Sequence, residues 1–156
     1  MKEVNALNQV SEFHRTFKHP ILPEPTIPSE KRCRLRVSLL AEELKELDKA
    51  IQDRDMVEIA DALCDIQYVL SGAVLEFGLA NKFKALFDEV HRSNMSKSCA
   101  SEKEALLTID HYKQEHDMDC HFEKSDDHYL VYRTEDHKTI KSINYSPAGL
   151  KSILDG

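Results

Sequence analysis

Hydrophobic residues recur every three or four positions through most of the first ninety residues, which is the periodicity of helices that bury one face. The first such stretch covers residues 4–17 and ends at His19-Pro20. Four prolines between residues 20 and 28 predict a stiff, extended connection. The same periodicity predicts three more helices, over residues 30–52, 56–77 and 81–90. Four helices with short connections favour a bundle.

Two residues at the predicted helix ends have the chemistry of caps. Ser29 precedes the second helix and is a candidate N-cap, because its hydroxyl can accept a hydrogen bond from a free backbone amide. Gly78 follows the third helix and is suited to the left-handed conformation that ends many helices. The third helix is the most apolar, so we expect it near the centre of the bundle.

The pattern changes after residue 97. Residues 101–114 predict another amphipathic helix, which begins with the capping-box pair Ser101 and Glu104. Short strands are predicted after it, and the last residues should form at most one helical turn. We therefore expect a mainly α fold in which residues 1–97 form the catalytic helical bundle. Residues 98–156 would add a helix and a small antiparallel β appendage to the same domain, with strands over residues 118–123, 128–133 and 138–143.

Composition excludes several classes of protein. The chain of 156 residues carries a formal charge of −7, which argues against binding a nucleic-acid polymer through its phosphates. No apolar run approaches the roughly 20 residues of a membrane-spanning helix, so no membrane partner is expected. The four cysteines form no CxxC pair, and the N-terminus lacks the features of a signal peptide. We therefore expect reduced thiols and a cytoplasmic protein.

Candidate chemistry lies on the second and third predicted helices. Glu43 and Glu46 are three positions apart, as are Glu58 and Asp61, so each pair projects from one face of its helix. A turn between the two pairs would fold the helices into an antiparallel hairpin and bring the four carboxylates together. Asp65 lies one turn beyond Asp61 and extends the cluster.

A divalent cation would explain carboxylates gathered on so apolar a hairpin. Unpaired carboxylates are costly to bury, and a hard cation removes that cost. Oxygen ligands without histidine or cysteine favour Mg²⁺, with Mn²⁺ as an alternative. Spacing alone leaves another interpretation open, in which the glutamates lie on a solvated surface and pair with Lys45 or Lys49.

The acidic segments also resemble a known superfamily. Glu42-Glu43-Leu44-Lys45-Glu46 followed by Glu58-Ile59-Ala60-Asp61 is similar to the EExxE and ExxD motifs of the MazG-like and phosphoribosyl-ATP pyrophosphohydrolase-like enzymes, although the stretch between them is at the short end for that pattern. The resemblance covers residues 4–97 well and the C-terminal part less specifically. Further similar segments are residues 61–68, 87–97 and 141–147.

The resemblance implies an all-α NTP-pyrophosphohydrolase-like bundle that splits the bond between the α and β phosphates of a nucleotide. Mg²⁺ would be held by the four acids of the motifs, and Asp65 would assist as a further ligand or by orienting water. The expected substrate is a nucleoside triphosphate in a house-cleaning reaction. Phosphoribosyl-ATP of histidine synthesis and a non-catalytic nucleotide-binding role are the alternatives. The metal ligands carried over are Glu43, Glu46, Glu58 and Asp61.

Substrate contacts are also implied by the resemblance. Asn94 and Lys97 correspond to residues that approach the nucleotide in similar proteins, and Arg92 lies in the same segment. An alternative is that Arg92 and Lys97 merely neutralise an acidic surface. Asn81 and Tyr68 are weaker candidates for contacts with the base or sugar, and a tyrosine within an apolar helix is often a core residue.

Two further expectations concern assembly and the histidines. The superfamily resemblance, and the poor burial available to a single helical hairpin, predict a homodimer or homotetramer. His14 is expected to be a packing or surface residue. The C-terminal region holds several candidate zinc ligands whose spacing matches no closed zinc site, namely His111, His116, Cys120, His121 and His128.

Overall fold

A computed structural model describes residue 2 and residues 4–156. The fold is mainly α with one small antiparallel sheet, as the sequence predicts. The chain divides into two compact units, Met1–Lys84 and Ala85–Gly156. Among the described residues, no helix is both long and apolar enough to cross a membrane.

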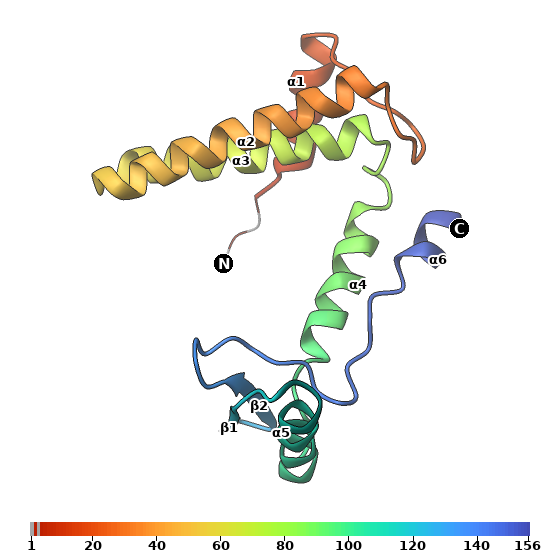
Figure 1. The fold of residues 1–156 in the computed structure, drawn as a ribbon. Helices are drawn as coiled ribbons and strands as arrows, with labels where there is room; N and C mark the ends of the chain where they lie inside the picture. The colour runs from red at the N-terminus through yellow and green to blue at the C-terminus, as the bar shows by residue number, and fades with distance from the viewer. Residues whose placement is uncertain (1, 3) are drawn as a thin grey trace. The chain divides into compact units, whose positions relative to one another are not determined.

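The first unit is built on a hairpin of two long helices. Helices α2 (Glu30–Asp53) and α3 (Met56–Glu76) run antiparallel and side by side (Figure 1). Helix α1 (Ala6–Thr16) packs against α3. Helix α3 is therefore in contact with both α1 and α2.

The turn of the hairpin is fixed by its own residues. Arg54 adopts the left-handed conformation, with φ 55°, and its amide donates to the end of α2. The Asp55 side chain then caps α3 by accepting hydrogen bonds from the amides of Val57 (2.9 Å) and Glu58 (3.2 Å). A capped helix start directly after a left-handed residue gives a short turn and sets which residues of α2 and α3 face each other.

The proline-rich segment is extended, as predicted, and lies along the end of α3. The amide of Leu22 donates to Leu75 (3.0 Å) and that of Thr26 donates to Phe77 (3.0 Å). Gly78 has φ +66°, and a Cβ built on it would lie 1.8 Å from the Glu24 carbonyl oxygen. The predicted helix end at this glycine is thus confirmed, and the close passage of the extended segment is a second reason for glycine here.

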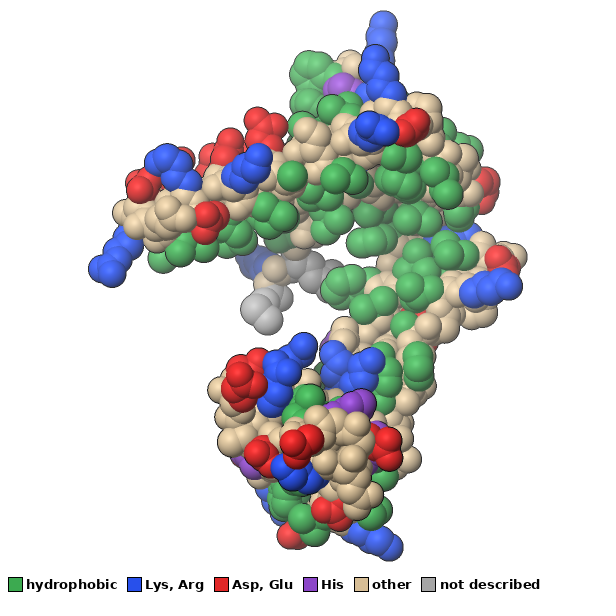
Figure 2. Space-filling view, viewed as in Figure 1, with side chains coloured by type: hydrophobic (Ala, Val, Ile, Leu, Met, Phe, Trp, Pro, Cys, Tyr) green, Lys and Arg blue, Asp and Glu red, His purple; other side chains and the backbone are tan. Residues whose placement is uncertain are grey.

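The apolar face of α3 is only partly covered. Its C-terminal half is buried from Ser71 to Glu76 except for Ala73, whereas Met56 and Val57 near its start are 73% and 75% exposed. Figure 2 shows hydrophobic side chains along one side of the hairpin. The expectation that α3 lies at the centre of a bundle is therefore correct within this unit only for its last six residues.

The second unit contains the β hairpin. Helix α4 (Phe83–Met95) begins at the boundary of the units, and α5 (Glu102–His116) packs against strands β1 (Cys120–Ser125) and β2 (His128–Arg133). The strands pair antiparallel, and α6 (Leu150–Asp155) ends the chain. The buried core of this unit consists of Cys99, Ala105, Val131 and Ile140.

The capping box at the start of α5 is confirmed in part. The Ser101 hydroxyl accepts from the Glu104 amide (3.2 Å), as predicted. The Glu104 carboxylate reaches back one residue further than expected, to the amide of Ala100 (3.0 Å). Ser29 differs, because its side chain makes no capping bond to α2 and only its carbonyl oxygen receives the first amides of the helix.

Three expectations about element boundaries are wrong. The third strand, at residues 138–143, is absent except for a bridge between Thr139 and Tyr132. Its last residues turn away because Ser142 donates its amide to the Lys97 carbonyl (3.1 Å) and Ile143 donates to the Thr108 hydroxyl (3.2 Å). The last segment forms a six-residue helix instead of a single turn, and α4 continues to residue 95 instead of ending at residue 90.

Candidate active site

The predicted carboxylates face each other across the α2–α3 hairpin. Glu46 from α2, and Glu58 and Asp61 from α3, line one pocket of about 340 Å³ near the turn. Ala50 and Ala62 are buried between the helices and their small side chains allow close approach. The hairpin therefore places acids from both motifs around one space.

Glu43 belongs to this group and lies about one turn before Glu46 on α2, further from the hairpin turn. It is partly buried, and its pKa is raised by that burial and then by the negative charges of Asp65, Glu46, Glu42 and Asp61. Repulsion from Asp65 and Asp61 means that both aspartates of α3 lie close to this side chain. The structure thus brings all five predicted acids together.

The carboxylates converge without touching. Within the part of the chain that the structure describes, no three of their oxygens lie within 4.8 Å of one another. One cation flanks them, since Lys49 pairs with Asp53 at 2.5 Å, and its pKa is raised by that aspartate and to a smaller extent by Glu58. Like charges held this way attract a cation, and the all-oxygen set fits Mg²⁺.

An apolar, aromatic pocket of about 200 Å³ lies on the same unit, and Leu39 and Tyr68 of its lining are about one helical turn from Glu43 and Asp65 in the sequence. Tyr68 meets Phe13 edge-on, with ring centroids 5.6 Å apart, and Phe13 stacks on His19 at 5.7 Å. Tyr68 is 39% exposed, so it is not a core residue. Tyr68 lies three residues after Asp65, which is about 4.5 Å along the axis of α3 at 1.5 Å per residue.

Three residues of the pocket lining, His14, Arg32 and Arg36, belong to a buried ionic network that the sequence analysis missed. Glu76 is 1% exposed and accepts hydrogen bonds from Arg32 (Nε to Oε2, 3.0 Å) and from Arg36. Burial would raise the pKa of Glu76, but the two guanidiniums outweigh it and lower the pKa. His14 is buried beside Arg36, with its Nδ1 2.9 Å from the Pro20 carbonyl oxygen, and burial lowers its pKa.

One signal of this network exists in the sequence. Glu76 is a lone acid at the end of the most apolar helix, where a charge is costly unless a basic partner reaches it. Nothing in the spacing identifies Arg32 and Arg36 as the partners, because they lie about 40 residues away on another helix. His14 is a packing residue, which is one of the two roles expected for it.

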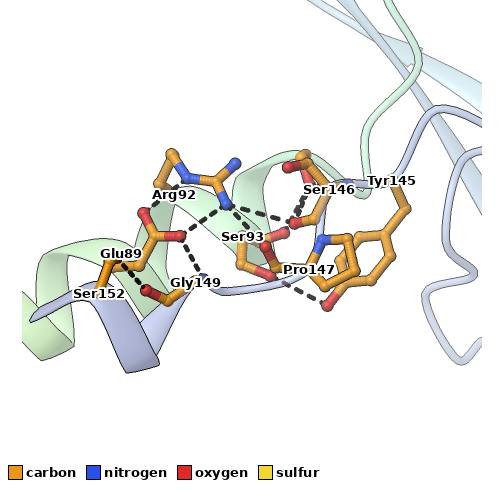
Figure 3. Close-up of polar contacts among 9 residues, drawn as sticks. Glu89, Arg92, Ser93, Tyr145, Ser146, Pro147, Gly149 and Ser152 are labelled. Atoms are coloured by element: carbon orange, nitrogen blue, oxygen red, sulfur yellow. Dashed lines mark hydrogen bonds and ion pairs between the residues drawn. The ribbon is translucent and has the colours of Figure 1, made fainter. Parts of the chain in front are cut away.

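Arg92 is engaged within the second unit (Figure 3). Its guanidinium binds the Glu89 carboxylate through two hydrogen bonds, of 2.7 and 2.8 Å, and donates to the Pro147 carbonyl at 3.0 Å. Glu89 also accepts from the amide of Gly149 (2.7 Å), which with Arg92 lowers its pKa to about 2. These contacts tie the C-terminal segment to α4.

The other predicted substrate residues are placed as follows. Asn94 is exposed on α4, and its side-chain oxygen accepts from Lys97 Nζ at 2.8 Å. Both lie in the second unit, whereas the acids lie in the first. Asn81 is exposed and lines a separate pocket of about 230 Å³ in the first unit, beside Leu22 and Leu75.

Carboxylates that face each other across an antiparallel helical hairpin in a mainly α chain are typical of one class, the all-α nucleotide pyrophosphohydrolases of the MazG-like superfamily. Comparison with known families agrees: the sequence model described as phosphoribosyl-ATP pyrophosphohydrolase matches residues 10–94, more than half of the chain, and the chain belongs to that family. Membership makes the protein a hydrolase of the nucleotide pyrophosphohydrolase type. The matched region contains all five acids.

A similar protein is found in a virus. An uncharacterized protein of Acanthamoeba polyphaga mimivirus is 24% identical, and the alignment covers 94% of each chain. The similarity therefore extends past the matched family region into the C-terminal unit.

Proposed function

We propose that the protein is a Mg²⁺-dependent nucleotide pyrophosphohydrolase that cleaves a nucleoside triphosphate between its α and β phosphates, giving monophosphate and pyrophosphate, in a house-cleaning role in the cytoplasm. The observation that carries the proposal is the convergence of five carboxylates from two helices, with the pKa of Glu43 raised by burial and by its acidic neighbours. Carboxylates that repel one another in this way bind a divalent cation more strongly than isolated ones.

The residues that would hold the cation are Glu43, Glu46, Glu58 and Asp61. When bound, Mg²⁺ would neutralise the polyphosphate and lower the pKa of an attached water, with Mn²⁺ as a substitute. Asp65 would serve as a further ligand or would orient the attacking water, because its charge acts on Glu43 and it is one turn further from the hairpin turn than Asp61.

The aromatic pocket next to the acids supports a nucleotide substrate. With the phosphates at the carboxylates, the adjoining space lined by Phe13, His19 and Tyr68 would take a flat aromatic base. Bases stack on aromatic side chains with useful energy, about 1–3 kcal/mol each. Tyr68 is therefore proposed as a base contact. Asn94, Lys97 and Asn81 stay predictions for substrate binding, and Arg92 is proposed as a structural residue instead.

A second candidate substrate is favoured by the family itself. The matching family is described by its action on phosphoribosyl-ATP, in which the bond cleaved also joins the α and β phosphates. The non-catalytic binding role is less well supported, since all four motif acids are present and face one another.

We also propose that the protein acts as a homodimer or a homotetramer. Large apolar side chains are exposed along both helices of the hairpin, including Val37 (68%), Leu44 (57%) and Leu63 (52%). A second copy of the hairpin would cover such a surface with matching apolar side chains. Light scattering at micromolar concentration tests this, and a monomeric mass would contradict it.

The test of the reaction is a product assay on purified full-length protein. Canonical and modified nucleoside triphosphates and phosphoribosyl-ATP are supplied with Mg²⁺ or with a chelator, and pyrophosphate and monophosphate are measured separately from phosphate and diphosphate. The variants are Glu43→Gln and Asp61→Asn. Asp48→Asn is the matched control, because Asp48 is an exposed acid of α2 that bonds Gln52.

We expect Mg²⁺-dependent pyrophosphate release that falls by at least about 100-fold in both acidic variants and is retained in the control. Preference for phosphoribosyl-ATP over every triphosphate would select the second candidate. Release of phosphate with diphosphate would contradict cleavage at the α–β bond. If nothing is hydrolysed while nucleotide still binds, the binding role would replace the enzymatic one.

A further inference from the structure

Three metal-binding side chains come together on the β hairpin of the second unit, away from the acids of the first unit in both sequence and role. They are His121 and Glu123 of β1 and His137, which follows β2. One ligand atom from each lies within 4.8 Å of the others, and His121 Nε2 is 3.7 Å from Glu123 Oε1. Two positions separate His121 from Glu123 on one strand, so both side chains project from the same face.

The ring of His137 is held over that same face by an aromatic stack. Tyr132 of β2 pairs with His121 in the register of the hairpin. The Tyr132 ring stacks on His137, with centroids 4.0 Å apart and an interplanar angle of 17°. His137 also stacks on His121 at 5.6 Å and 26°. The register of two strands and one stacked tyrosine therefore determine how the two imidazoles approach.

The loop that carries His137 is itself fixed. The His137 amide donates to the Arg133 carbonyl (2.9 Å), and the Arg133 guanidinium binds the Asp136 carboxylate, with Nε 2.7 Å from Oδ1. His137 adopts φ 58°, in the left-handed region that histidine, like asparagine and aspartate, enters more often than most residues with a side chain. The turn is closed on the other side of His137 as well, because the Arg133 amide donates to the Lys138 carbonyl (2.9 Å).

We propose that His121, Glu123 and His137 form a binding site for a divalent transition-metal ion such as Zn²⁺. Two imidazole nitrogens and one carboxylate oxygen are a ligand set that zinc accepts, with a water in the fourth position. His121 Nδ1 lies 3.5 Å from the Thr134 hydroxyl, which leaves Nε2 directed to Glu123. The imidazoles distinguish this site from the all-oxygen acids of the hairpin, which suit Mg²⁺.

The distances are close to those of a coordinated ion. Tetrahedral ligands about 2.05 Å from zinc are about 3.3 Å from one another. The His121–Glu123 separation of 3.7 Å needs to shorten by only about 0.4 Å, and the largest separation, at most 4.8 Å, by at most about 1.5 Å. Rotation of exposed side chains achieves this without moving the strands. An ion pair between His121 and Glu123 alone would not involve the third ligand atom, on the His137 ring, which lies within 4.8 Å of both.

The bound ion would join β1 to the loop after β2. Both side chains of the His121–Glu123 pair are partly exposed, at 42% and 57%, so an ion can enter from solvent and keep a water ligand. The expected consequence is a more rigid hairpin, because two imidazoles on different segments share one ion. The inference is independent of the proposed pyrophosphohydrolase activity.

Zinc binding is tested on the full-length protein by isothermal titration calorimetry with Zn²⁺, in excess Mg²⁺ and with thiols kept reduced. Co²⁺ is titrated in parallel, because its visible absorption reports tetrahedral coordination. The variants are His121→Gln, Glu123→Gln and His137→Gln. His116→Gln is the matched control, since His116 is an exposed histidine of the same unit at the end of α5. Asp61→Asn reports on the acids of the hairpin.

We expect one Zn²⁺ site per chain that weakens at least tenfold in each of the three variants and is unchanged in His116→Gln and Asp61→Asn. Circular dichroism should be the same for all of them, because the substituted side chains are exposed or half-buried. Equal affinity in the wild type and in His137→Gln would overturn the proposal. Loss of the site in Asp61→Asn, or a strong near-ultraviolet thiolate band with Co²⁺, would assign the metal to other residues and also overturn it.

Discussion

Replacement of Glu76 by glutamine should strongly destabilise the first unit. The carboxylate is 1% exposed and is the shared acceptor of Arg32 and Arg36. Glutamine has nearly the same volume but no charge, and its NH2 group, which can only donate, would replace one of the two oxygens that accept from the guanidiniums. Arg36 would then be a buried cation without a counter-charge. Removing one partner of a buried ion pair costs about 3–5 kcal/mol.

The assay is urea-induced unfolding followed by circular dichroism. With an m-value on the order of 1 kcal/mol per molar urea, a loss of about 3 kcal/mol lowers the midpoint by about 3 M. Glu12→Gln is the control, because Glu12 is an exposed acid of α1 and should leave the midpoint unchanged. A midpoint lowered by less than about 0.5 M in Glu76→Gln would refute the reasoning, as that is the range of ordinary surface substitutions.

The dependence on pH gives a second check on the same residue. The pKa of Glu76 is lower in the folded protein than the usual value near 4.3, so between these two values the unfolded chain binds more protons. Its stabilising effect is therefore fully present above the unfolded pKa and is lost as the pH falls through the folded pKa. The difference in stability between wild type and Glu76→Gln should shrink below about pH 4, whereas a difference that grows in acid would contradict the assigned sign.

Three further substitutions test other parts of the structure. Gly78→Ala should destabilise the protein by more than about 2 kcal/mol, because Gly78 has φ +66° and an added Cβ would collide with the Glu24 carbonyl oxygen. Gly149→Ala is the control, because a Cβ added there has no atom closer than 3.6 Å. Equal unfolding midpoints for the two variants would contradict the collision. Glu43→Gln should abolish pyrophosphate release, yet the metal-free variant should be as stable as the wild type or more stable by up to about 1 kcal/mol. The reason is that burial and repulsion raise the pKa of Glu43 and disfavour its charge. A large loss of stability in urea unfolding would show a structural role for Glu43 instead. Glu89→Gln should speed amide hydrogen exchange in α6, because the Glu89 carboxylate accepts from Arg92 and Gly149, and unchanged exchange would show that this contact does not hold the C-terminal segment.

Most helices could be predicted from the sequence because their hydrophobic periodicity is local. The same holds for the gathering of the acids: spacings of three within each helix and one short turn determine that Glu43 and Asp61 face each other. What the pattern does not contain is burial in three dimensions. Leu44 and Leu63 have the periodicity of buried residues and yet are more than half exposed in the single chain.

Long-range pairings account for the rest of what sequence reasoning missed. The Arg36–Glu76 pair joins residues 40 positions apart, and no local pattern predicts it. The approach of His121 and His137 depends on strand register and on one left-handed residue. A third strand is predicted over residues 138–143, but Ser142 and Ile143 donate their amides to residues outside the sheet. Competition for backbone donors is decided by tertiary structure.

Glu76 and Glu43 of the hairpin lie in opposite electrostatic environments, and this separates stability from function. At one end Glu76 is buried between two arginines, which lower its pKa and make the charge part of the fold. Midway along the hairpin, burial and the charges of four neighbouring carboxylates raise the pKa of Glu43. A cation arriving from solvent would relieve that repulsion, whereas it would find no free charge at Glu76. Added Mg²⁺ should therefore raise the melting temperature by binding the carboxylates around Glu43 and not by any contact with Glu76.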